Sequence, residues 1–100
     1  QKALLQKYIT DFEAWYGAGI TNTFGGHAYD SLMMVVDALK AVGPDKAKIR
    51  DYIENNIVNW PGTGGVYNMS PQNHNGLPRD AKQAMILVKI VDSKWTWLKD

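Results

Sequence analysis

The hundred-residue sequence contains no cysteine, which excludes a disulfide scaffold, a cysteine nucleophile and a thiolate-ligated metal. It also lacks an excess of one charge: the formal net charge is +1 and the basic residues are scattered, so we expect no nucleic-acid partner. No apolar run reaches the roughly 18 residues that would predict a membrane-spanning helix. The sequence has only two histidines and no cysteine to act as metal ligands, so we expect no metal site. We also expect no other cofactor.

What the sequence does contain is the composition of a globular α/β protein. Hydrophobic residues make up 45% of the chain and charged residues 21%, and four tryptophans and five tyrosines need large surfaces to cover them. One stretch organises the rest: a turn over residues 23–30 leads into the apolar run 31–42. Its apolar side chains follow helical spacing and surround the helix on nearly every side, which predicts a buried helix. They are Ala28, Leu32, Met33, Met34, Val35, Val36, Ala38 and Leu39.

The remaining pattern predicts helices on both sides of this central helix and strands after them. We expect helices over residues 1–16 and 26–42 and a third one opening at Pro44 and Asp45. Residues 59–65 and 70–80 are predicted loops because they are rich in glycine and proline, and 66–69 is a short strand candidate. Residues 83–91 form the most pronounced strand, apolar on both faces, joined by a three-residue connection at 92–94 to a partner strand at 95–98.

The apolar strand at residues 83–91 and the apolar helix at residues 26–42 need more packing partners than the other predicted elements supply. A strand that is apolar on both faces requires neighbours on both edges and helices on both sides. The sequence therefore predicts a piece of a larger α/β protein, and the isolated hundred residues are expected to associate as a dimer through their C-terminal hairpins.

Few residues suggest chemistry. His27 and Asp30 lie three apart at a helix start, which is compatible with an acid–base pair and equally with an ordinary first-turn carboxylate beside a polar histidine. Phe24-Gly25-Gly26 precedes a helix and could bind an anion through backbone N–H groups, although the phosphate-loop pattern is missing. His74 lies among turn-forming residues and is expected to be structural.

Taken in order, several segments resemble one known family, the periplasmic solute-binding proteins of the branched-chain amino acid (Leu/Ile/Val) type. The segments that carry the resemblance are Tyr16-Gly17, His27-Ala28-Tyr29-Asp30-Ser31, residues 38–43, residues 49–54, residues 62–67, Asn68-Met69-Ser70-Pro71, His74-Asn75-Gly76-Leu77 and the terminal hairpin. They span essentially the whole chain, although members of the family are about three times as long. One departure is Asn73, where the subgroup usually carries an aspartate before His-Asn-Gly.

The resemblance implies a fold, a function and a site. The fold would be a fragment of a two-lobe type I periplasmic-binding-protein fold, with residues 1–80 in the first lobe and the hairpin of residues 81–100 packed on the second. The ligand would be a branched-chain or related amino acid, or a similar small carboxylate, bound by Thr23, Phe24, Gly26 and His27. Delivery to the membrane permease of an ABC uptake transporter would place the protein in the periplasm and would involve no catalysis. A small enzyme or a sensor domain using His27 and Asp30 is the alternative.

Overall fold

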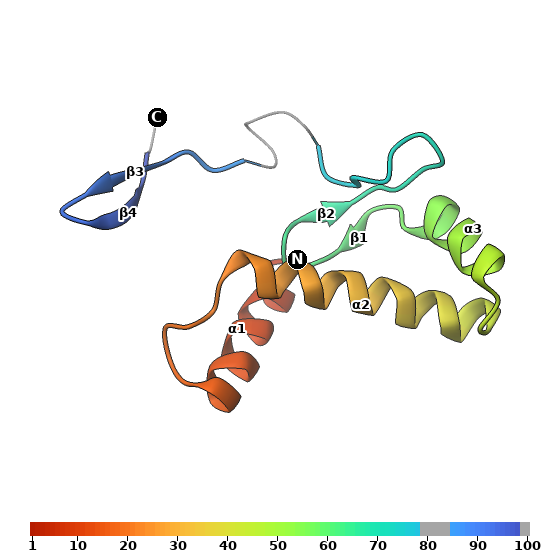
Figure 1. The fold of residues 1–100 in the computed structure, drawn as a ribbon, viewed down its shortest axis with the longest axis horizontal. Coiled ribbons are helices and arrows are strands. Elements are labelled where there is room, and N and C mark those ends of the chain that lie inside the picture. Colours follow the sequence, from red (N-terminus) through yellow and green to blue (C-terminus); the bar gives the residue numbers. More distant parts are fainter. Residues whose placement is uncertain (79–84, 99–100) are drawn as a thin grey trace.

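The computed structural model describes residues 1–78 and 85–98 and shows three helices followed by two small antiparallel sheets (Figure 1). The elements are α1 (Lys2–Tyr16), α2 (Thr23–Val42), α3 (Lys46–Asn56), β1 (Trp60–Pro61), β2 (Val66–Tyr67), β3 (Val88–Val91) and β4 (Lys94–Trp97). The described part of the chain is thus a small mixed α/β structure, as predicted. The expected boundary between residues 80 and 81 lies outside the described residues.

The helix boundaries follow from capping side chains. Asn22 precedes α2, and its side-chain oxygen accepts a hydrogen bond from the Gly25 N–H at 3.1 Å. This cap starts the helix at Thr23 instead of the predicted residue 26 and places both glycines inside its first turns. Asp45 caps α3 in the same way, accepting from the Lys48 N–H at 3.0 Å, which confirms the prediction made for that residue.

The central helix α2 is not buried on all sides, and here the sequence prediction was wrong. Its buried residues are Gly26, Asp30, Met34 and Ala38, which recur at every fourth position and form one narrow face. Three residues of the predicted apolar stripe instead lie in contact with solvent: Leu32, Val35 and Leu39 are 61%, 37% and 40% exposed. The buried face includes Asp30 because this side chain binds the β1–β2 segment, so hydrogen bonding selects the covered side of the helix together with the packing of Met34 and Ala38.

A small core fills the space between α2, α3 and the β1–β2 hairpin. Met34, Ile57 and Tyr67 are buried there. Partly buried neighbours pack against them: Tyr52, Ile53, Trp60, Met69 and Leu77. The predicted loop over residues 59–65 contains β1, which pairs with β2 in the register Trp60↔Tyr67 and Pro61↔Val66. The strand expected at 66–69 is confined to Val66–Tyr67.

The C-terminal hairpin differs from its prediction in three ways. The paired strand covers only Val88–Val91 of the expected 83–91, of which 83 and 84 lie outside the described residues. The connection is a two-residue turn at Asp92 and Ser93, whose φ angles of 49° and 62° are those of a type I′ hairpin turn, so the three-residue connection was wrong. The β3–β4 register is Val88↔Trp97, Lys89↔Thr96, Ile90↔Trp95 and Val91↔Lys94. All four residues of β3 are exposed, so neither face of the paired strand is buried in the described part of the chain.

Candidate functional site

The buried carboxylate of Asp30 connects α2 to the segment between β1 and β2. Asp30 is 1% exposed. Its Oδ1 accepts the Thr63 N–H at 2.7 Å, while Oδ2 accepts the Gly64 N–H at 2.9 Å and the hydroxyls of Thr63 and Tyr67 at 3.1 Å each. Four donors for two oxygens leave the carboxylate well compensated for its loss of water. We call Asp30 with Thr63, Gly64 and Tyr67 the Asp30 network.

His27 joins the same network through Tyr67 and does not touch Asp30. The Nδ1 atom of His27 lies 3.1 Å from the Tyr67 hydroxyl, which donates its single proton to Asp30. The Tyr67 oxygen must therefore accept from His27, which fixes the Nδ1–H tautomer of the neutral imidazole. Nε2 then has no hydrogen-bond partner among the described residues and remains an acceptor that a ligand can use. Burial, and then the Asp30 carboxylate, raise the pKa of Tyr67, so its hydroxyl stays protonated as a donor.

Glycines allow the close approach that these bonds require. A Cβ atom on Gly62 would lie 2.5 Å from the Tyr67 ring and 2.7 Å from Oδ2 of Asp30. A Cβ atom on Gly64 would lie 2.7 Å from Cε1 of His27. The glycine-rich segment of residues 62–65, which the sequence analysis predicts only as a loop, thus places backbone N–H groups next to the Asp30 carboxylate.

Beside the network lies a groove of about 700 Å³, bordered by α1, the start of α2, the β1–β2 segment, Ile86 just before β3, and Val88 at the start of β3. Thr23, Gly26 and His27 line this groove together, so the structure brings three of the four residues predicted to bind the ligand to one place. The fourth, Phe24, is 86% exposed and does not line it. The remaining lining residues are Leu5, Tyr8, Ile9, Thr21, Asn22, Thr63, Gly64, Leu77, Ile86 and Val88.

The polar groups that the described residues place in the groove are threonine hydroxyls, the Tyr8 hydroxyl, the Asn22 amide and the His27 imidazole, mixed with aliphatic side chains. Among the described residues, the lining includes no lysine, arginine, aspartate or glutamate. This part of the surface can hold an apolar group and form a few directional hydrogen bonds. Sequence reasoning missed Thr63 and Gly64 because they lie more than thirty residues from His27 in the chain, and only the Asp30 bonds bring them close.

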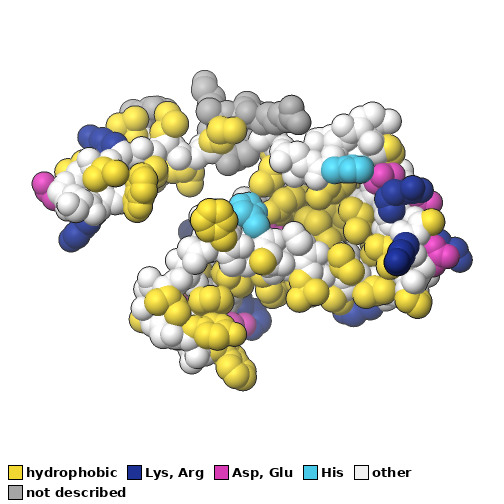
Figure 2. Space-filling model, in the orientation of Figure 1, with side chains coloured by type: hydrophobic (Ala, Val, Ile, Leu, Met, Phe, Trp, Pro, Cys, Tyr) yellow, Lys and Arg dark blue, Asp and Glu magenta, His cyan; other side chains and the backbone are white. Residues whose placement is uncertain are grey.

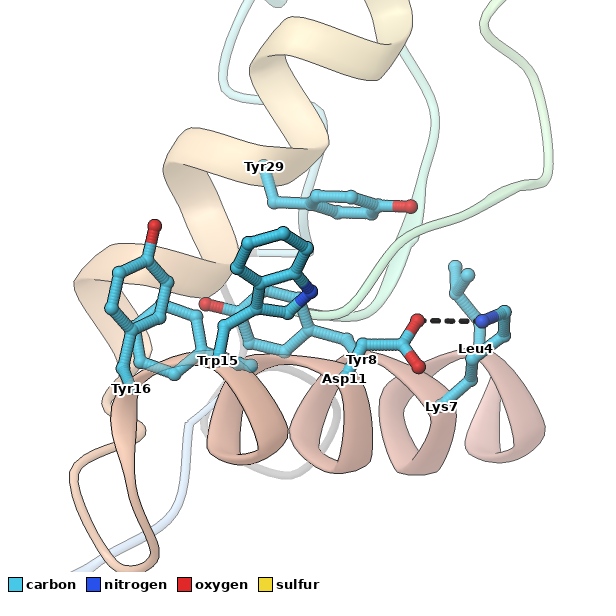
Figure 3. A pocket seen from close by; sticks show the side chains of 8 residues that line it. Leu4, Lys7, Tyr8, Asp11, Trp15, Tyr16 and Tyr29 are labelled. Atoms are coloured by element: carbon cyan, nitrogen blue, oxygen red, sulfur yellow. Dashed lines mark hydrogen bonds and ion pairs between the residues drawn. The ribbon is translucent and has the colours of Figure 1, made fainter.

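A second cleft, of about 370 Å³, lies between α1 and α2 and is lined by aromatic rings (Figure 3). Tyr8, Phe12 and Tyr16 stack along α1, with ring centroids 5.7 and 4.7 Å apart, and Tyr29 of α2 packs on Tyr8 at 5.3 Å. The Tyr8 hydroxyl is buried and has no partner within the described part of the chain. None of the predicted ligand-binding residues lines this cleft, although Tyr8 lines both the cleft and the groove described above.

The other histidine has a structural position. Nε2 of His74 lies 2.9 Å from a carboxylate oxygen of Glu54, so the loop after β2 is tied to α3. Across residues 1–78 and 85–98 no three histidine, cysteine or acidic side chains gather as metal ligands would. The same residues form no helix with the length and hydropathy needed to cross a membrane.

Comparisons with known proteins give no match: no protein-family model fits the chain, and neither a curated protein nor a solved structure is similar to it at a significant level. The functional interpretation therefore rests on the residues and their geometry.

Proposed function

We propose that this chain is a segment of a periplasmic solute-binding receptor of the branched-chain amino acid type. In the complete receptor, a branched-chain or related amino acid, or a similar small carboxylate, would bind between two α/β lobes and pass to the permease of an ABC transporter. The observation that carries the proposal is the meeting of Thr23, Gly26 and His27 at one groove. The family resemblance assigns these three residues to the solute-binding site.

The chemistry of the groove narrows the part of the solute that this segment would contact. Its aliphatic and neutral polar lining suits the side chain of an aliphatic or aromatic amino acid better than its charged ends. His27 would accept one hydrogen bond through its free Nε2, and the exposed ring of Phe24 would supply an apolar wall once the second lobe closes over it. The ammonium and carboxylate groups would be bound by residues elsewhere in the receptor.

The alternative of a small enzyme or sensor that uses His27 with Asp30 is less well supported. A carboxylate that moves a proton in catalysis needs an oxygen within reach of the substrate. Both oxygens of Asp30 are already used by four donors, and the side chain is buried. These bonds favour an architectural role for Asp30 and leave His27 as the group that can meet a ligand.

The test is a calorimetric titration of the complete receptor that contains this chain. Leucine, isoleucine, valine, glutamine, phenylalanine and benzoate form a suitable panel, and we expect at least one of them to bind without chemical change. In His27→Ala the affinity for that solute should fall by about 1–2 kcal/mol, the scale of one buried hydrogen bond. Since the second histidine contacts Glu54 outside the groove, His74→Ala is the matched control and should leave the affinity unchanged.

Two results would contradict the proposal. Equal affinities of the wild type and His27→Ala for every bound solute would remove His27 from the binding site. Turnover of a panel compound, followed by NMR of the compound itself, would favour the enzyme alternative.

A further inference from the structure

His27 faces the solute with a ring nitrogen whose hydrogen-bonding role is fixed by a chain of hydrogen bonds. The carboxylate of Asp30 can only accept, so the Tyr67 hydroxyl donates to it at 3.1 Å and accepts from the Nδ1–H of His27 at 3.1 Å. The single proton of the neutral imidazole is thereby held on Nδ1. Nε2 is left as an acceptor, and it cannot donate unless the ring is protonated or this chain of bonds breaks.

Two threonine hydroxyls that line the same groove are restricted in the same way. The hydroxyl of Thr63 donates to the Asp30 carboxylate at 3.1 Å, and the hydroxyl of Thr21 donates to the Glu13 carboxylate at 3.2 Å. Because a hydroxyl has one proton, each of these oxygens can offer a solute only its lone pairs. The carboxylates beside the groove thus turn three of its polar groups into acceptors.

An acceptor that is covered without receiving a donor destabilises the complex. The side chains of Asn22, Thr23 and Tyr8 carry protons that a solute could use, but no hydrogen bond joins any of them to Nε2 of His27 in the described part of the chain. His27 is exposed, so Nε2 loses its water when a second lobe closes over the groove. A site that hydrogen-bonds one N–H or O–H of its ligand rejects analogues without that group, because its own polar atom is then left unpaired.

We propose that the solute of this groove carries an N–H or O–H donor on its side chain or ring, which Nε2 of His27 accepts, and that Tyr67 is the positioning residue that sets this preference. This specificity rests on the solute-binding role proposed above and narrows it. Amino acids with an amide or hydroxyl side chain and hydroxylated small carboxylates belong to the class, whereas leucine, isoleucine and valine do not. The aliphatic lining of the groove would contact the carbon skeleton that bears the donor.

The first test is the position of the imidazole proton, which needs no solute. The two histidines of the chain are both exposed and appear apart on one face of the molecule (Figure 2). Nε2 of His74 lies 2.9 Å from a Glu54 carboxylate oxygen and must carry a proton there, so the two rings should hold their protons on opposite nitrogens. A two-bond nitrogen–proton correlation spectrum of the chain distinguishes the tautomers at mildly alkaline pH, where free histidine is neutral.

We expect Nδ1–H in His27 and Nε2–H in His74. In Tyr67→Phe the acceptor for Nδ1–H is gone, so the proton of His27 should move to Nε2 while His74 stays as it was. The matched control Tyr52→Phe removes the hydroxyl of a partly buried core tyrosine outside the groove and should change neither ring. An Nε2–H tautomer of His27 in the wild type would overturn the proposal.

The second test compares solutes that differ by a donor, using calorimetric titration of the complete receptor. The pairs are threonine with valine, asparagine with leucine, tyrosine with phenylalanine, and para-hydroxybenzoate with benzoate. In a pair that binds, we expect the donor-bearing member to bind at least about ten-fold more tightly. This preference should disappear in His27→Ala and in Tyr67→Phe and persist in His74→Ala and Tyr52→Phe.

The outcomes separate this specificity from the proposed function. Binding without a preference for the donor-bearing member of any pair would overturn the specificity and leave solute binding standing. An equal loss of affinity for both members of a pair in His27→Ala would show that Nε2 accepts from the α-ammonium, which also overturns it. If no solute of the panel binds, the proposed function and this specificity both fail. The wild-type spectrum and affinities remain decisive even if Tyr67→Phe does not fold.

Discussion

The Asp30 network buries a charged side chain, whereas the β3–β4 hairpin exposes large apolar side chains. Asp30 is charged and 1% exposed, whereas Ile90 and Trp95 are apolar and 65% and 76% exposed. The network joins residues 33 to 37 positions apart in the chain. The hairpin joins residues separated by a two-residue turn.

The difference shows that available partners, and not polarity alone, decide what is buried in a chain of this size. Asp30 tolerates burial because four donors replace its water. Ile90 and Trp95 would gain from burial, but they remain 65% and 76% exposed. Substitutions in the two regions should therefore have effects of very different size.

The largest effect is expected from Asp30→Ala. The substitution leaves the Thr63 and Gly64 N–H groups and two hydroxyls without their acceptor. Hydrogen bonds to a charged group contribute about 1.5–3 kcal/mol each, and buried donors without partners add a desolvation penalty. We expect the free energy of unfolding to fall by about 3 kcal/mol or more, measured by urea denaturation followed at 222 nm.

Asp51→Ala is the control for that experiment. Asp51 lies exposed on α3 and pairs with its neighbour Arg50 on the surface. Exposed ion pairs contribute about 0–1 kcal/mol, so this variant should unfold nearly as the wild type does. If the two aspartate variants lost similar stability, the carboxylate of Asp30 would not be the link that holds α2 to the β1–β2 segment.

A smaller effect is expected from Tyr67→Phe, which removes one bond to Asp30 and the contact with His27. The loss should be about 1–2 kcal/mol in the same urea titration. Tyr52→Phe is a matched change at a partly buried tyrosine of the same core, and it should cost less because no hydrogen bond of the Tyr52 hydroxyl is broken.

The pH dependence of stability sharpens this test. The pKa of Tyr67 is raised in the folded state by burial and by the Asp30 carboxylate, from an ordinary value of 10.0. Tyr67 therefore supports folding fully below pH 10, and that contribution is lost as the pH rises above 10, where the unfolded chain ionises first. The unfolding free energy should fall more steeply above that pH in the wild type than in Tyr67→Phe. Parallel curves would show that the Tyr67 proton is not linked to folding.

The smallest effect is expected in the hairpin turn. Ser93 has a φ of 62°, a conformation that glycine adopts without steric cost. Ser93→Gly should stabilise the hairpin locally by about 0.5–1 kcal/mol, visible as slower amide hydrogen exchange in β3 and β4. The urea midpoint at 222 nm should not move, since that signal reports the helices. A shift of that midpoint would show that the hairpin and the helical region unfold together.

The sequence was sufficient for features that depend on neighbouring residues. The extent of the first helix, the start of the third helix at Asp45 and the existence of the terminal hairpin all follow from helical spacing, capping residues and alternation. The start of α2 was missed because Asn22, Thr21 and Thr23 are all acceptable caps, and only geometry shows that Asn22 binds the Gly25 N–H. The site residues Thr23, Gly26 and His27 were selected through a family resemblance, and their spacing of three and four residues places them on one face of a helix. Their meeting with Thr63, Gly64 and Leu77 at one groove could not be derived from the sequence.

Features that depend on distant residues could not be predicted. Asp30 was interpreted as a first-turn carboxylate or as a catalytic partner of His27, because its actual partners lie beyond residue 60. The buried face of α2 was misassigned for the same reason, since a helix with apolar residues on every side gives no indication of which side a polar anchor will select. The two-residue turn was missed because Asp92 and Ser93 lack the glycine that usually marks such turns.

The long separation of Asp30 from its partners also has a kinetic meaning. Bringing residues about 35 positions apart into contact costs about 3 kcal/mol of chain entropy before any bond is formed. Helices and hairpins, by contrast, form within microseconds because their contacts are local. Formation of the contact between the Asp30 carboxylate and the Thr63–Gly64 backbone is therefore expected to limit the folding rate of the helical region. The hairpin is expected to form and open many times before this contact is made.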